Sequence, residues 1–74
     1  MIHSKSTTVQ ITIKGHLTSD WAEYLGGLAM TTETQATHTT TILSGEIIDQ
    51  AALMGILNNL YGLGFSILSV KYQF

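Results

Sequence analysis

The absence of cysteine is the feature that most restricts how this chain of 74 residues can fold. A chain of this length forms a single domain, here residues 1–74, of which 1–6 are expected to be flexible. One core of this size stabilises a fold by only ~3–5 kcal/mol, so small domains usually add a disulfide, a metal or a partner. Disulfides and cysteine-rich zinc sites are excluded. Association with a second copy is therefore the simplest source of further stability.

The chain is also poor in charge. Asp, Glu, Lys and Arg make up 11% of the residues, against about 25% in an average soluble domain. Neutral hydroxyl and amide side chains do little to keep molecules apart, so we predict a homo-oligomer. The net charge of −2 and the scattered positions of Lys5, Lys14 and Lys71 argue against a nucleic-acid partner, and we expect none. No apolar run approaches the ~20 residues of a membrane span, and no secretory signal is present. We expect a cytoplasmic protein with no membrane partner.

Alternating side chains predict three strands in the first part of the chain. From Thr7 to Lys14, β-branched and polar residues alternate, which is typical of a half-buried strand. The threonine-rich segments 28–33 and 38–44 are predicted to form a hairpin with its turn within 34–37. Neither segment has a strongly apolar face, so the sequence leaves the pairing register of 28–44 open.

A short helix is predicted between the first strand and the hairpin. Asp20 and Glu23 have the spacing of a capping box. Leu17, Trp21 and Leu25 follow one another at intervals of four residues, which places them on one helix face. The pair of glycines that follows ends the helix. Trp21 is the largest side chain on that face, so we expect it to be buried and to anchor the helix to the sheet.

The second helix and the last strand have the clearest signals. Asp49 is a favourable N-cap, and Gly64 is expected in the left-handed conformation that ends a helix. Gly55, in mid-helix, predicts the close approach of another backbone. The apolar stripe of this helix is Leu53, Ile56, Leu57 and Leu60. Residues 66–74 form the predicted last strand, with one side made of Leu68, Val70, Tyr72 and Phe74.

Taken in order, these elements predict an α+β domain of the ferredoxin-like βαββαβ type. The expected architecture is a mixed four-stranded sheet with a short first helix and a longer second helix on one face. The opposite face carries many of the threonines and is open.

Two segments resemble a family of small, uncharacterised bacterial proteins. Residues 43–70, LSGEIIDQAALMGILNNLYGLGFSILSV, are similar to the C-terminal half of that family. The block Asp49-Gln50-Ala51-Ala52-Leu53 is the most specific part of this similarity. The pattern KGHL…W…GGL between residues 14 and 28 resembles its N-terminal half. Met54 stands where the family commonly has His, which argues against metal binding or proton transfer there. The resemblance implies a fold and no established activity.

A weaker similarity is to ACT-type regulatory domains, whose acidic turn, helix and closing strand resemble residues 49–70. The matching half is the second one in this chain rather than the first. The resemblance implies pairing through sheets or helices and a small molecule bound at the dimer interface. The ligand-binding residues predicted on this basis are Gly45, Glu46, Asp49, Gln50 and Gly55.

The residues capable of chemistry form no recognisable catalytic motif. His3, His16 and His38 lack the short spacing of a metal site, and His3 lies in the terminal segment. An enzyme built on this chain would use His16 or His38 as a base beside Glu46, with Tyr72 close to both groups. Asp20 and Asp49 are better explained as helix caps. We therefore predict no catalytic residues, no metal and no cofactor.

Three classes of function are consistent with these patterns. The first, which we favour, is an interaction module that forms oligomers and has no catalytic activity. The alternatives are an ACT-like sensor of a small molecule and a small ferredoxin-like dimeric enzyme. Tyr72 and Phe74, close to the C-terminus, are candidate interface residues, because they either pack within the chain or cover a partner.

Overall fold

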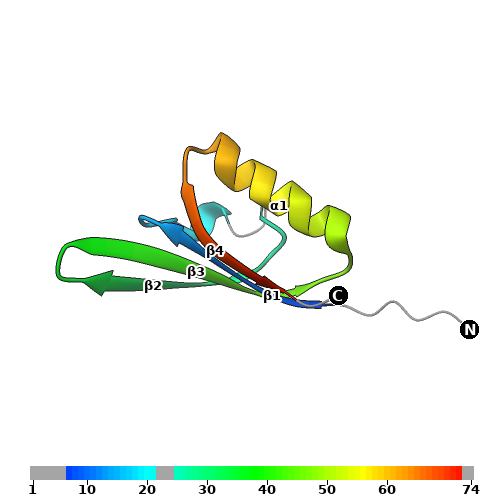
Figure 1. Cartoon of the computed structure of the whole chain (residues 1–74), viewed down its shortest axis with the longest axis horizontal. Coiled ribbons are helices and arrows are strands. Elements are labelled where there is room, and N and C mark those ends of the chain that lie inside the picture. The colour runs from blue at the N-terminus through cyan, green and yellow to red at the C-terminus, as the bar shows by residue number, and fades with distance from the viewer. Residues whose placement is uncertain (1–6, 22–24, 73–74) are drawn as a thin grey trace, which may run out of the picture.

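The computed structural model describes residues 7–21 and 25–72, so the predicted flexibility of residues 1–6 lies outside the described residues. Its elements are β1 (Thr7–Lys14), the short 3₁₀ turn η1 (Ser19–Trp21), β2 (Ala29–Gln35), β3 (His38–Ile47), α1 (Gln50–Gly62) and β4 (Ser66–Tyr72). The sheet has the order β2-β3-β1-β4, and every neighbouring pair is antiparallel. α1 lies across one face of the sheet (Figure 1).

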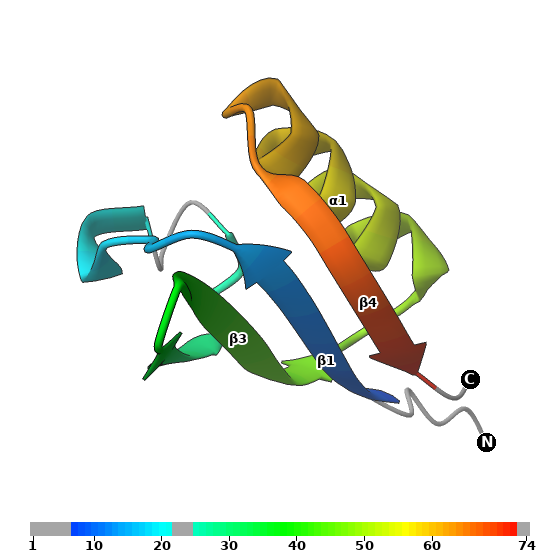
Figure 2. The same ribbon diagram turned by 60° about the vertical axis from the view of Figure 1, so that its left-hand side comes forward.

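The core lies between the sheet and α1. The alternation predicted for β1 is confirmed, because Val9, Ile11 and Ile13 are all completely buried. α1 packs against β4 and β3 (Figure 2). The buried apolar side chains are Val9, Ile11, Ile13, Leu17, Leu25, Leu28, Leu43, Ile47, Leu53, Ile56 and Leu60.

The prediction of a ferredoxin-like βαββαβ sandwich is wrong. Within the described residues, α1 is the only α-helix, and the connection from β1 to β2 contains only the three-residue turn η1. The sheet is also antiparallel throughout rather than mixed. The element order is β-β-β-α-β, and the described residues of the crossover from β1 to β2 lie on the same side of the sheet as α1 (Figure 1).

Two hydrogen bonds to Thr41 hold the chain at the point where the crossover leaves β1. The hydroxyl of Thr41, which is completely buried, donates to the carbonyl of Gly15 at 2.7 Å. The same oxygen accepts a hydrogen bond from the backbone N–H of Leu17 at 3.1 Å. These contacts fix the chain where it leaves β1 and direct Leu17 into the core. Leu25 and Leu28 enter the core at the end of the crossover.

The prediction that Trp21 is buried is also wrong. Its side chain is 36% exposed, whereas Leu17 and Leu25 are almost completely buried. The four-residue spacing of these side chains therefore does not mark one face of a helix. Glu23, the second residue of the expected capping box, lies outside the described residues.

Both predicted ends of α1 are confirmed. The Asp49 carboxylate accepts a hydrogen bond from the backbone N–H of Ala52 at 2.8 Å. At the other end, Gly64 has a φ of 89° and Phe65 donates its N–H to the carbonyl of Leu60 at 3.1 Å. This bond, together with that from Gly64 to Tyr61 at 3.0 Å, forms a Schellman motif.

Asp49→Ala is expected to lower the free energy of unfolding by about 0.5–2 kcal/mol, because the amide of Ala52 loses its acceptor. Urea unfolding at a fixed protein concentration measures this loss. Asp49→Asn retains an acceptor oxygen and is expected to lose less. Equal stability of the alanine variant and the parent chain would contradict the capping role.

A bulge in β4 changes which side chains face the core. The pairing of β4 with β1 shifts between Thr12 and Ile13, so Leu68 has no partner in β1. Ile67 and Val70 pack against the core, and Leu68 is exposed on the opposite face. The prediction that Leu68 shares a side with Val70 is therefore wrong. The bulge adds one residue between two inward-facing positions.

The predicted hairpin is formed by β2 and β3. Its turn consists of residues 36–37, within the range that the sequence indicates. The pairing is continuous from Ala29 opposite Ser44 to Gln35 opposite His38. The end of this hairpin extends past the helix layer (Figure 1). In the strand order of the sheet, β2 forms one edge, with β3 as its single neighbour.

Candidate interaction surfaces

The outer face of α1 carries no charged side chain, which is unusual for a solvent-facing helix. We define this face as the exposed residues of α1 that follow Gln50, namely Ala51, Met54, Gly55, Asn58, Tyr61 and Gly62. Tyr61 is 79% exposed and Met54 is 49% exposed. None of the 13 residues of α1 is charged. A solvent-facing helix normally carries charged side chains on this face, so the outer face of α1 is a candidate interface.

Gly55 lies in the middle of this face. The sequence predicts that another backbone approaches it, but a Cβ added at Gly55 would meet nothing within 4 Å. No described element of the same chain therefore packs closely against this position. Glycine in a helix interior costs up to about 1 kcal/mol relative to alanine. The free space at Gly55 leaves room for a neighbouring molecule.

The edge of β2 is the second candidate surface. All seven residues of β2 are exposed except Met30, which is partly buried. The strand contains a single charged residue, Glu33, and no proline. Its pairing with β3 has no bulge. Edge strands are usually protected by charge, proline, a bulge or a covering segment, and β2 has only one charge.

The five predicted ligand residues lie on β3, at the N-cap of α1 and along α1. Gly45 faces the core, where an added Cβ would lie 2.9 Å from Leu28 Cδ2. Glu46 is exposed near the end of β3, and Asp49 caps α1. Gln50 begins α1 and is exposed, and Gly55 lies on its outer face. A ligand bound by these residues between two copies stays a prediction.

His16 and His38 lie on opposite faces of the sheet. His16 Nδ1 lies 3.5 Å from the hydroxyl of Thr32, on the side that faces α1. His38 Nδ1 lies 3.2 Å from the hydroxyl of Thr37, at the hairpin turn. His38 and Glu46 are eight residues apart on the extended strand β3, a separation of roughly 26 Å. The arrangement expected for an enzyme, with His38 beside Glu46, is not formed.

Of the two predicted interface residues, Tyr72 is described by the structure. Tyr72 ends β4 opposite Val9, and its side chain is half exposed. Phe74 lies outside the described residues. Among the residues that are described, no three histidine, aspartate or glutamate side chains come together as a metal site.

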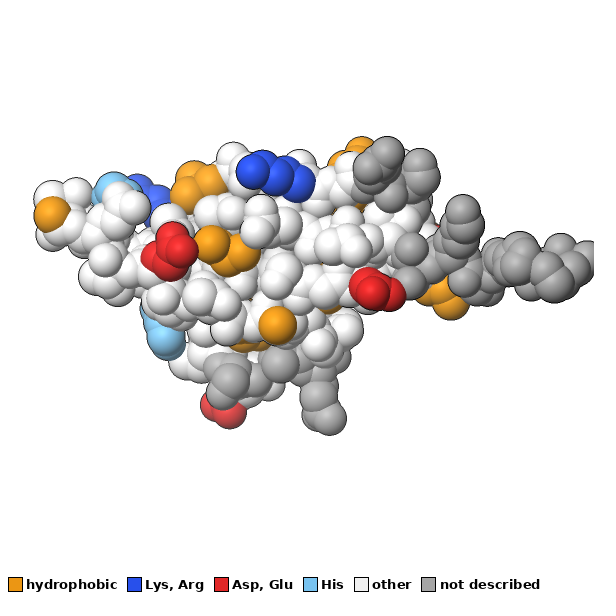
Figure 3. Space-filling model, turned by 90° about the horizontal axis from the view of Figure 1, so that it is seen from below, with side chains coloured by type: hydrophobic (Ala, Val, Ile, Leu, Met, Phe, Trp, Pro, Cys, Tyr) orange, Lys and Arg blue, Asp and Glu red, His pale blue; other side chains and the backbone are white. Residues whose placement is uncertain are grey.

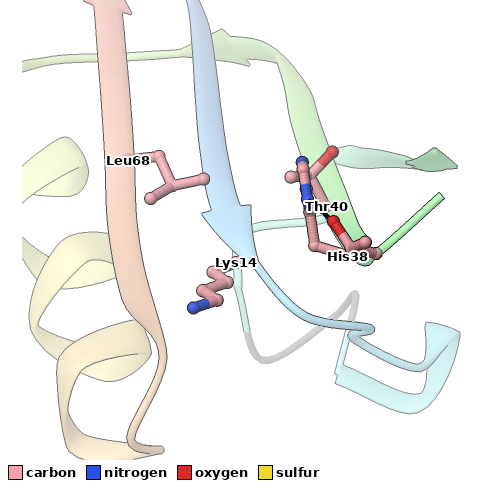
Figure 4. Close-up of a pocket in the computed structure, with 5 residues that line it drawn as sticks. Lys14, His38, Thr40 and Leu68 are labelled. Atoms are coloured by element: carbon pink, nitrogen blue, oxygen red, sulfur yellow. Dashed lines mark hydrogen bonds between the residues drawn. The ribbon is translucent and has the colours of Figure 1, made fainter. Parts of the chain in front are cut away.

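A shallow depression lies on the open face of the sheet, near the hairpin turn. It has a volume of about 470 Å³ and is lined by Lys14, Thr37, His38, Thr40 and Leu68. Figure 4 shows that the amine of Lys14 points away from the imidazole of His38. The two basic groups therefore do not converge on one ligand position. Sequence reasoning missed this depression because the bulge is what places Leu68 there.

The rest of the open face carries mainly hydroxyl and amide side chains. Figure 3 shows this face, on which hydrophobic groups are small and separate. Thr8, Gln10 and Thr12 project from β1, and their partners on β3 are Glu46, Ser44 and Ile42. Such a surface is hydrated without a partner, so the open face is a weaker candidate for association than either surface described above.

These features define a small β-β-β-α-β domain with an uncharged helix and an open sheet edge. Residues 8–71 match the family described as Domain of unknown function (DUF8691), and the chain belongs to this family. The resemblance to uncharacterised proteins is confirmed at this level, whereas the similarity to ACT-type domains stays a prediction. No curated protein and no solved structure has significant similarity to the chain. In the part of the chain that the structure describes, no helix has the length and apolar character needed to cross a membrane.

Proposed function

We propose that this chain is a non-catalytic module that associates with a second copy of itself through the outer face of α1. The observation that carries the proposal is the absence of charge from a solvent-facing helix on which Met54 and Tyr61 are exposed. The low charge of the whole chain supports it, because an 8.0 kDa monomer has little charged surface to keep it apart from its neighbours.

The outer face of α1 is complementary to itself. Met54 and Tyr61 are seven residues apart, which is about two helical turns or 10 Å. Two copies of α1 packed antiparallel about a two-fold axis would place each Met54 beside the Tyr61 of the other copy. Both contacts form at once, as a symmetric interface requires. A thioether against an aromatic ring is a favourable contact.

Two further features favour a helix partner over a small ligand. Gly55 lacks a side chain and has open space above it, so a second helix can approach closely. The antiparallel arrangement also places the N-terminal end of each helix near the C-terminal end of the other, which the helix dipoles favour. The absence of charged side chains means that association would remove no ionised group of α1 from water.

Tyr61→Glu is expected to weaken self-association and so to lower the average mass of the chain in solution at micromolar concentration. The substitution places a carboxylate against the Met54 of the second copy, where it would lose hydration. Sedimentation equilibrium over a range of concentrations measures the shift. The matched control is Leu68→Glu, at a side chain that is 54% exposed on the open face of the sheet.

Dissociation by Tyr61→Glu, with Leu68→Glu behaving like the parent chain, would support the proposed interface. A parent chain that stays at 8.0 kDa at every concentration would contradict it. Dissociation by Leu68→Glu alone would transfer the interface to the open face of the sheet. Circular dichroism confirms that each variant is folded before it is compared.

A further inference from the structure

We infer that the edge of β2 is a second interface, at which β2 of one copy pairs antiparallel with β2 of another. The two four-stranded sheets then form one continuous sheet. This inference goes beyond the proposed function, because β2 and the outer face of α1 are separate surfaces. It rests on the exposure, length and charge pattern of β2.

The first argument is that the two edges of the sheet differ. β4, at one edge, has a bulge at Leu68 and carries Lys71, and both features oppose pairing with another strand. β2, at the other edge, runs without interruption over seven residues. In an antiparallel pair, alternate residues direct their N–H and C=O groups away from the neighbouring strand. The outward groups of β2 therefore form a regular row that a strand of the same length can match.

The second argument is the register that full overlap imposes. When two copies of Ala29–Gln35 pair antiparallel along their whole length, Thr32 lies opposite Thr32 of the second copy. Met30 then lies opposite Thr34 and Thr31 opposite Glu33, each pair occurring twice. Every residue of β2 gains a partner. The partly buried Met30 also gains a neighbour on the side of the sheet that faces α1.

The third argument is charge. Glu33 is the one charged residue of β2, and in this register it faces the hydroxyl of Thr31 rather than a second carboxylate. A register shifted so that Glu33 lies at the two-fold axis would place like charges directly opposite each other, which is unfavourable. The position of Glu33, one residue from the centre of the strand, therefore favours the fully overlapping register.

The test places a negative or a positive charge at Thr31, opposite Glu33 of the second copy. Thr31→Glu would create two pairs of like charges and is expected to weaken association roughly tenfold. Thr31→Lys would create two pairs of opposite charges and is expected to strengthen association by a similar factor. Thr31 is exposed on β2, so both variants keep the core unchanged. Sedimentation equilibrium at low salt measures the dissociation constants.

The matched control repeats both substitutions together with Glu33→Gln. Without the carboxylate, Thr31→Glu and Thr31→Lys should have the same effect on association. All variants are also measured together with Tyr61→Glu, which weakens only the α1 interface. The β2 result therefore does not depend on whether α1 associates.

Opposite effects of the two charges that disappear with Glu33→Gln would establish the pairing and its register. The inference would be overturned if Thr31→Glu and Thr31→Lys changed association in the same direction. It would also be overturned if neither changed association, or if the chain stayed monomeric. Amide hydrogen exchange provides an independent measurement. Alternate amides of β2 should exchange more slowly as concentration rises, while those on the outer edge of β4 should not change.

Discussion

Leu25→Ala is expected to lower the free energy of unfolding by about 2–5 kcal/mol, a large part of the stability of a domain of this size. Leu25 is completely buried and belongs to the central apolar cluster. It reaches the core from the crossover between β1 and β2. Its loss would leave a cavity in the core, because the side chains of the cluster come from β1, β3, α1 and the crossover and cannot all move inwards.

Trp21→Ala is the matched comparison, and its expected loss is about 1 kcal/mol. Trp21 is larger than Leu25, but it is the more exposed of the two. Urea unfolding of both variants at one protein concentration keeps the contribution of association the same in the two measurements. A loss for Trp21→Ala equal to that for Leu25→Ala would restore the interpretation of Trp21 as the anchor of this segment.

Elements with local signals could be predicted from the sequence. β1 begins and ends where the alternation of Thr7–Lys14 begins and ends. Asp49 and Gly64 determine the two ends of α1 through their own backbone and side-chain geometry. Each of these signals acts within a few residues of the chain, so no tertiary contact is needed to interpret it.

Two of the errors in the fold, the expected first helix and the side of Leu68, arise from contacts between distant segments. The crossover is held by Thr41, which is 24 residues from Leu17, and no local pattern shows that contact. The bulge in β4 depends on its pairing with β1. In the sequence, Ile67 and Leu68 are adjacent apolar residues, and either could belong to the inner face. The antiparallel pairing with β1 decides in favour of Ile67.

The candidate surfaces were predictable to different degrees. The absence of charge from α1 and the glycine at its centre are visible in the sequence, and they indicate close packing there. The sequence does not show that this packing partner lies outside the chain. The open edge of β2 was missed because the position of a strand in the sheet depends on topology, which the composition of the strand does not determine.

Thr41→Val is expected to lower the free energy of unfolding by about 2–5 kcal/mol, because one buried and one partly buried polar group would lose their partner. The hydroxyl of Thr41 donates to the carbonyl of Gly15 and accepts from the N–H of Leu17. Valine has nearly the same shape, so the core around position 41 stays filled. The loss therefore measures the hydrogen bonds that hold the crossover.

Thr41→Ser is the control that separates these hydrogen bonds from packing. Serine keeps the hydroxyl and removes one methyl group, so a loss of about 1 kcal/mol is expected. Urea unfolding gives both values, and hydrogen exchange of the Leu17 amide should accelerate in the valine variant alone. A smaller loss for valine than for serine would show that the methyl group, rather than the hydroxyl, is what matters at Thr41. The crossover would then be held in place by the packing of Leu17 and Leu25, and its hydrogen bonds to β3 would contribute little.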